Sequence, residues 1–213
     1  MKALASIVLV SSLLLGSSPA AAQVSTKTVR FKSGGSTVFR GVYVGPYQGQ
    51  VISEPGQPTI DLFCVDYQNE IRVGDVWTAN FTRLDYWDLS KTRFNDRTEY
   101  QQAAWLARQF TLQPKSEWGS IDYAIWNLTT PGTPNLGQAS NGAYWLGQAQ
   151  TASNYQSINL ANWVVVTDTL TRNGVGGKQE YLTRNVVPEP ATVLLLGSGI
   201  FGLGLVGFFK RDA

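Results

Sequence analysis

The 213-residue sequence contains no histidine. Without an imidazole the chain cannot assemble a Ser-His-Asp or Cys-His catalytic group, a zincin-type helix or most zinc and copper sites. An enzyme built from this chain would have to rely on paired carboxylates, lysine or tyrosine. We therefore expect a protein that is not an enzyme, with no catalytic residues, no metal site and no cofactor.

Cysteine and charge are also scarce. Cys64 is the only cysteine, so no intrachain disulfide can form. Charged residues make up 15% of the chain, and 17 basic residues face 15 acidic ones. No run of basic residues interleaves with aromatic residues, so we expect no nucleic-acid partner.

The first 22 residues have the pattern of a secretory signal peptide. Lys2 precedes an apolar stretch at 3–15, and small residues then lead to a cleavage position after Ala22. The apolar stretch is too short for a membrane-spanning helix. We therefore expect the chain from Gln23 onward to be exported.

The C-terminal stretch "VVPEPATVLLLGSGIFGLGLVGFFKRD" has a different character. Residues 191–209 carry no charge, and a helix of that length reaches roughly 28 Å, which matches a bilayer core. Lys210 and Arg211 would hold its far end on the cytoplasmic side. Pro188 and Pro190 fix φ and remove two donors, which predicts an extended hinge before the helix.

The body between these ends, residues 23–186, is long enough for one domain with a core. Alternating polar and apolar residues predict strands, and Gly34 with Gly35 suggests that the first two strands form a hairpin or follow each other directly. The predicted strands are 24–31, 37–44, 59–66, 70–78, 163–167 and 179–186.

The periodicity becomes helical in the middle of the body. It predicts helices at 97–111 and 117–128 and a weaker one at 141–152. Asp96 is placed to cap the first helix, with Glu99 three residues later. The fold class is therefore α+β: a mixed strand body with two or three inserted helices, closed by strands from both ends of the domain.

Two functional alternatives depend on side chains of the body. All seven tryptophans lie between Trp77 and Trp163, where most are expected in the core, and exposed coplanar ones would make a glycan-binding module. A hydrolase would need two facing carboxylates at catalytic separation. The candidate pairs are Asp61 with Asp66 and Asp85 with Asp88.

The tail closely resembles the PEP-CTERM sorting signal, which is also labelled as the C-terminal domain of an ice-binding protein. The resemblance covers 187–213 and rests on Val187, Pro188, Glu189 and Pro190, followed by the apolar segment and the basic end. It implies export across the inner membrane of a Gram-negative bacterium and temporary anchoring with the body in the periplasm. Cleavage near Pro-Glu-Pro by an exosortase would then release the protein to the cell surface or beyond.

The body resembles bacterial thioester domains in three segments: "LFCVDY" at 62–67, "QQAAWLARQF" at 101–110 and "IDYAIWNL" at 121–128. In that family a cysteine pairs with the glutamine of a T-Q-x-A-[IV]-W motif. The resemblance would explain the single cysteine, and it implies a covalent adhesin if the pair is complete.

The thioester motif departs from the family at its reactive position. Asp122 stands where the family has glutamine, and an ionised carboxylate is a poor electrophile with no amine to expel. Gln101 fits Q-x-A-x-W and is a substitute acceptor for Cys64. Without an acceptor, Cys64 is a small buried core residue.

Together these features predict an exported cell-surface or matrix protein with a structural or adhesive role in an exopolysaccharide or biofilm context. Its expected partners are an exosortase, the inner membrane before processing, and a polysaccharide or a surface protein. The alternatives are a glycan-binding module that uses exposed tryptophans, an active thioester adhesin and a hydrolase.

Overall fold

The computed structural model describes residues 24–184, which is almost all of the predicted body. The predicted signal peptide, the sorting signal and the apolar segment 191–209 lie outside the described residues. Between 24 and 184, every helix is too short or too polar to cross a bilayer.

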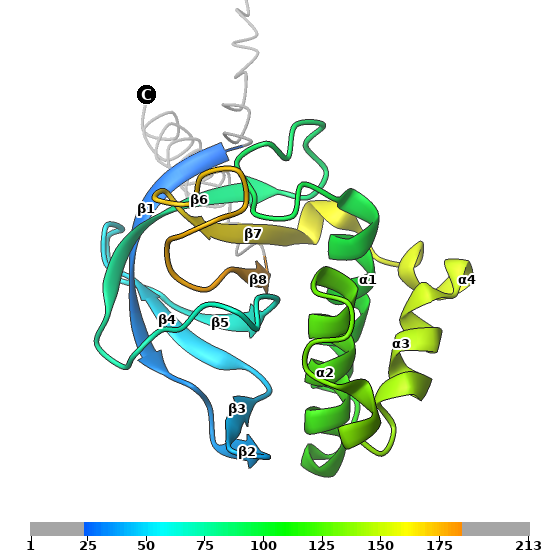
Figure 1. The fold of residues 1–213 in the computed structure, drawn as a ribbon. Coiled ribbons are helices and arrows are strands. Elements are labelled where there is room, and N and C mark those ends of the chain that lie inside the picture. The colour runs from blue at the N-terminus through cyan, green and yellow to red at the C-terminus, as the bar shows by residue number, and fades with distance from the viewer. Residues whose placement is uncertain (1–23, 185–213) are drawn as a thin grey trace, which may run out of the picture.

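Six antiparallel strands form a closed barrel in the order β1-β4-β5-β8-β7-β6 (Figure 1). Barrel closure depends on β5 and β8, which pair Phe63 with Leu182 and Cys64 with Tyr181 although they are far apart in the chain. The predicted closure of the domain by strands from both ends is therefore confirmed. The strands are β1 (Val24–Ser33), β4 (Tyr47–Val51), β5 (Thr59–Cys64), β6 (Val76–Arg83), β7 (Trp163–Asp168) and β8 (Tyr181–Arg184).

Side chains fill the interior of the barrel, as expected for so few strands. Aromatic rings gather toward one mouth around Tyr181, whose ring centroid lies 6.0 Å from that of Tyr47. The Phe31 and Trp77 centroids each lie 6.4 Å from the Tyr181 centroid. This mouth is also where the candidate site lies.

The helices are inserted between β6 and β7 and gather on one side of the barrel (Figure 1). Asp96 caps the first of them by accepting a hydrogen bond from the Glu99 backbone N–H at 3.0 Å, as predicted. The α-helices are α1 (Arg97–Gln109), α2 (Trp118–Thr129), α3 (Gly142–Gln150) and α4 (Ala152–Tyr155), and short 3-10 turns occupy Lys115–Glu117, Leu136–Gln138 and Leu160–Asn162.

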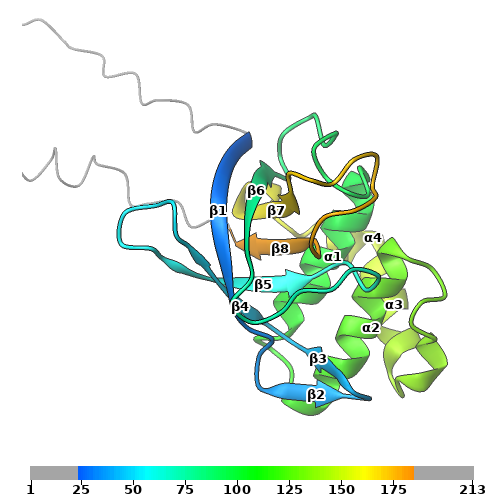
Figure 2. The same cartoon turned by 60° about the vertical axis from the view of Figure 1, so that its left-hand side comes forward.

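The predicted strand at 37–44 is wrong, because a tight turn divides it. Arg40 and Gly41 have φ angles of 50° and 84°, and the flanking β2 (Thr37–Phe39) and β3 (Val42–Val44) pair with each other. The strand β1 pairs with β4 and β6 instead of β2. The β2–β3 hairpin lies beside α2, outside the barrel (Figure 2).

Two further predictions need correction. The strand expected at 70–78 begins later, at Val76, because residues 70–75 form a loop with a turn closed by Asp75 on Arg72. The described residues contain four α-helices where two or three were expected. The coarse prediction of a domain that combines strands and helices is confirmed, but the barrel was not anticipated.

Candidate functional site

Cys64 is the last residue of β5 and is completely buried, with 0% of its surface exposed. Its thiol donates a hydrogen bond to the backbone carbonyl of Asp66, at 3.3 Å. Burial raises the pKa of the thiol well above its ordinary value, and the nearby Asp66 and Asp122 carboxyls add to this effect. The thiolate is the reactive form of cysteine, so Cys64 is a weak nucleophile in this environment.

Asp122 lies on α2 and is equally inaccessible to solvent. One carboxyl oxygen accepts a hydrogen bond from the Gly45 backbone N–H at 2.5 Å. The other oxygen has no hydrogen-bond partner among the residues that the structure describes. Burial raises the pKa of this carboxyl well above its usual range, which favours the neutral acid.

The structure brings Cys64 and Asp122 into one buried group between the barrel and α2. Asp122 is close enough to raise the pKa of Cys64, and both residues raise the pKa of the Tyr47 hydroxyl, whose largest shift comes from burial. Trp126, one turn of α2 beyond Asp122, lies near the thiol, and its indole N–H has no hydrogen-bond partner among the described residues. The cysteine and the residue at the motif's glutamine position therefore lie in the same buried region, within electrostatic range of each other.

Gln101 does not join this group through any hydrogen bond within residues 24–184. It lies near the start of α1 and is partly buried. Its neighbour Tyr100 points its hydroxyl at Glu180, in a separate polar cluster. The structure therefore favours Asp122 over Gln101 as the residue facing Cys64.

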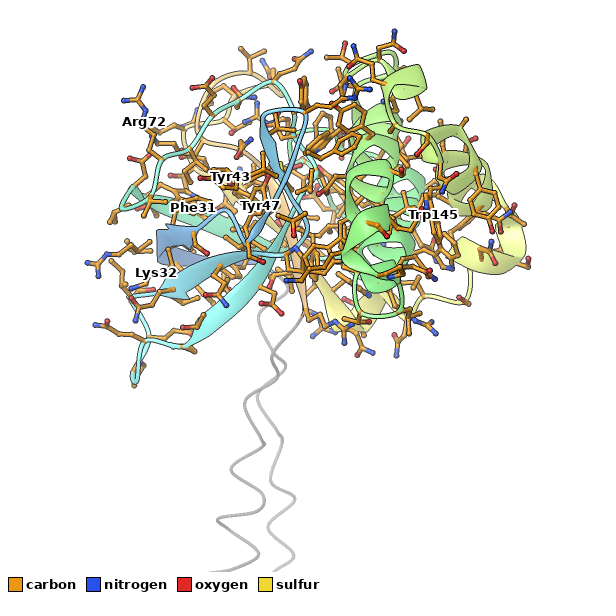
Figure 3. All side chains as sticks on the ribbon, turned by 90° about the horizontal axis from the view of Figure 1, so that it is seen from below. Phe31, Lys32, Tyr43, Tyr47, Arg72 and Trp145 are labelled. Atoms are coloured by element: carbon orange, nitrogen blue, oxygen red, sulfur yellow. The ribbon has the colours of Figure 1, made fainter. Side chains whose placement is uncertain are left out.

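An open cavity of about 610 Å³ lies at the mouth of the barrel beside this buried pair. Tyr47 and Trp126 line the cavity and lie near Cys64, whose thiol is itself fully buried. Phe31, Tyr43 and Tyr47 lie on the barrel side of the molecule, away from Trp145 among the helices (Figure 3). Asn69, Glu70, Arg72 and Gln179 contribute the polar part of the lining.

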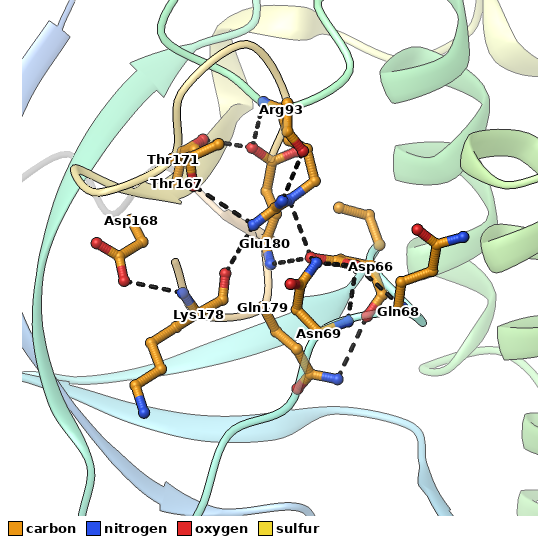
Figure 4. Close-up of polar contacts among 12 residues, drawn as sticks. Asp66, Gln68, Asn69, Arg93, Thr167, Asp168, Thr171, Lys178, Gln179 and Glu180 are labelled. Carbon is orange, nitrogen blue, oxygen red and sulfur yellow. Dashed lines mark hydrogen bonds and ion pairs between the residues drawn. The ribbon is translucent and has the colours of Figure 1, made fainter. Parts of the chain in front are cut away.

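Sequence reasoning missed a buried polar cluster centred on Arg93 (Figure 4). The Arg93 guanidinium forms a 2.9 Å ion pair with Asp66, and both side chains are almost fully buried. The Arg93 backbone N–H donates to a Glu180 carboxyl oxygen at 2.7 Å. These residues are 27 and 87 positions apart from Arg93, and each sits alone in its own segment, so no local pattern reveals the cluster.

Glu180 is the most strongly enclosed acid of this cluster. The hydroxyls of Tyr100 and Thr167 donate to its two oxygens. Burial raises the pKa of Glu180 to about 7, although these hydrogen bonds and Arg93 act to lower it. Its charge therefore changes in the physiological pH range.

The Arg93 guanidinium also fastens the loop between β7 and β8. It donates to the backbone carbonyls of Gly174, Gly176 and Lys178 at 2.7, 2.8 and 3.0 Å. Both terminal nitrogens of the guanidinium thus have protein acceptors, and Nε lies in the ion pair with Asp66 without a well-aligned hydrogen bond. Buried charges that are paired in this way usually have a structural role. We therefore treat the cluster as a clamp that holds the loops around the barrel.

In each pair considered for a hydrolase, at least one acid is engaged with another partner. Asp66 pairs with Arg93 and also accepts from the Asn69 side chain at 2.9 Å. Asp85 pairs with Arg83, and Asp88 accepts from the Ser90 backbone N–H at 2.8 Å. Within residues 24–184, no three side chains of the histidine, cysteine and acidic types gather as metal ligands.

The tryptophans do not form the exposed platform that a glycan-binding module was expected to use. Trp87 is 79% exposed, whereas Trp77, Trp126, Trp145 and Trp163 are buried. The two remaining tryptophans pack partly buried against the core. The aromatic side chains accessible at the cavity are tyrosines instead.

Comparisons with protein-family models, with curated proteins and with solved structures find no match to this chain. The two resemblances drawn from its motifs therefore remain the basis for any statement about its function.

Proposed function

We propose that this protein is an exported, exosortase-processed surface or matrix component whose barrel domain adheres without covalent chemistry or turnover. The signals at both ends of the sequence support export and processing. The burial of Cys64 and the carboxyl group of Asp122 argue against a reactive thioester, and they are the observation that carries the proposal of a passive domain.

A thioester forms when a cysteine sulfur attacks a side-chain carboxamide carbon, the C–N bond breaks and ammonia leaves. Asp122 offers a carboxyl group at that position, so the reaction would have to expel water from an unactivated acid. Cys64 is also held as a protonated thiol by burial. We therefore expect Cys64 to remain a free thiol in the mature protein.

Intact-mass measurement of the protein from an exosortase-containing host tests this proposal. We expect the signal peptide to be absent after Ala22, the tail to be removed near Val187–Pro190, and the body to have its full mass. A secreted form that keeps the tail would overturn the processing claim. A deficit of about 18 Da that disappears in Cys64→Ala would reveal a thioester made by loss of water and overturn the passive role.

A gain-of-function substitution tests the geometry directly. Asp122→Gln restores the carboxamide, so we expect a mass deficit of about 17 Da from loss of ammonia, and capture of added methylamine. The double variant Asp122→Gln, Cys64→Ala should keep its full mass. An unchanged mass in folded Asp122→Gln would mean that the resemblance to thioester domains is limited to the arrangement of elements.

A further inference from the structure

We propose that the open cavity at the barrel mouth binds a chain of neutral sugars, held by tyrosine rings. This proposal gives a ligand class to the adhesive role proposed above and rests on that role for its biological meaning. Its physical basis is the lining of the cavity, which combines aromatic faces with two charged side chains that make no hydrogen bond to the described residues.

Tyr43 supplies the most accessible aromatic surface. Its side chain is 55% exposed, yet its ring lies directly against the backbone at Gly34, where an added Cβ would come within 2.7 Å of the ring. Glycine at position 34 therefore lets the ring lie flat on the barrel rim. Tyr67 supplies a second, partly exposed ring, packed 4.9 Å from Trp126 between ring centroids.

These rings suit a saccharide. A tyrosine combines an apolar face with a polar tip and loses little conformational entropy when it is already packed. A pyranose ring offers a matching apolar face of C–H groups with hydroxyls around its edge. Two part-exposed rings on one cavity therefore favour a ligand with more than one sugar unit.

Polar side chains at the rim have free hydrogen-bonding capacity. The side chains of Glu70 and Arg72 line the cavity, are exposed, and make no hydrogen bond to the described residues. Gln179 is already occupied, because it donates to the Asp66 carbonyl and accepts from the Tyr181 hydroxyl. Glu70 and Arg72 thus supply an acceptor and donors for hydroxyls, and their opposite charges favour a neutral ligand.

The cavity walls are held in place before any ligand arrives. The Tyr47 hydroxyl donates to the Tyr43 backbone carbonyl at 2.7 Å, which fastens the β2–β3 hairpin to the barrel. The Gly45 backbone N–H then ties the same segment to Asp122 on α2. A wall fixed on both sides costs little ordering entropy on binding.

Other ligand classes fit the cavity less well. Its volume of about 610 Å³ is typical of ligand sites, but it is open and partly polar, whereas a lipid chain needs an enclosed apolar tunnel. A nucleotide or phosphate needs convergent positive charge, and Arg72 is offset by Glu70. A neutral saccharide can use both the rings and these two side chains of opposite charge.

Calorimetric titration of the secreted protein with cellopentaose, laminaripentaose and maltopentaose tests the proposal. We expect saturable binding of at least one of them, with a dissociation constant between about 10 μM and 1 mM. Tyr43→Ala should weaken that binding at least about tenfold, which corresponds to one lost aromatic contact. Tyr43→Phe should retain most of it, and Glu70→Gln and Arg72→Ala should each weaken it several-fold.

Tyr144→Ala is the matched control, since Tyr144 is 58% exposed but lies on α3, among the helices. It should bind like the unchanged protein. Absence of binding by all three sugars at about 10 mM would overturn the proposal, as would binding that Tyr43→Ala leaves unchanged. If the cavity bound a peptide or an acidic polysaccharide but none of the neutral sugars, the proposed ligand class would be wrong. None of these outcomes affects the mass measurements, so the two proposals fail separately.

Discussion

At the scale of single residues, Glu180 couples the fold to pH. Its pKa of about 7 in the folded protein lies above the ordinary value of 4.5. Between these two pH values the unfolded chain releases a proton that the folded chain keeps, so the free energy of unfolding falls as the pH rises. The fall from this residue amounts to at most about 3 kcal/mol, and buried Asp122 acts in the same direction.

Urea unfolding at several pH values between 4.5 and 8 measures this dependence. Glu180→Gln cannot ionise, so its stability should fall less steeply with rising pH than that of the unchanged protein. The exposed Glu70→Gln should reproduce the original slope. Equal slopes in the unchanged protein and in Glu180→Gln would show that Glu180 does not bind the extra proton.

At the scale of elements, α2 depends on a glycine where the β2–β3 hairpin crosses it. A Cβ at Gly119 would lie 2.4 Å from the Phe39 ring. Gly119→Ala should therefore lower the free energy of unfolding by about 1–3 kcal/mol, because the hairpin must move away from the helix. Thermal or urea unfolding of the purified variant measures the change.

Gly147 on α3 provides a helical glycine with the opposite expectation. It is exposed, and a Cβ there would meet no atom within 4 Å. Gly147→Ala should raise the free energy of unfolding by about 0.5–1 kcal/mol through helix propensity alone. If Gly119→Ala raised the free energy of unfolding as Gly147→Ala is expected to do, the contact between Phe39 and Gly119 would not be a packing constraint.

The helices were predictable because their signals are local. The period of apolar residues and the Asp96 cap located α1. The strand β4, with the sequence "YQGQV", was missed because it is only five residues long and has a glycine at the middle of its three inward positions. The turn at Arg40 and Gly41 was missed because an arginine with positive φ is uncommon in such a turn.

The candidate site was predictable only in part, for a related reason. Motif resemblance singled out Cys64 and Asp122, and the structure does bring them together. The Arg93 cluster and the tyrosine cavity each combine segments that are distant in the chain, so their members carry no shared pattern in the sequence. Barrel closure creates both sites, and closure is a property of long-range pairing.

At the scale of the whole molecule, the accessibility of the single thiol, Cys64, measures whether the barrel is closed. Cys64 is fully buried at the end of β5, where it takes part in the long-range pairing with β8. A reagent can reach the sulfur only if β5 separates from its neighbours or the domain unfolds. We expect the second route, because the Arg93 clamp and both neighbouring strands hold this end of β5.

Thiol labelling under native conditions measures which route operates. With a small maleimide in excess, the labelling rate gives a free energy of opening, which should equal the free energy of unfolding measured with urea. Each protein molecule should bind one equivalent of the reagent. Arg93→Ala should lower both free energies together if opening is global. Labelling much faster than global unfolding would instead reveal local opening of the β5–β8 pair. Denatured protein that binds no reagent would show that the sulfur is already acylated.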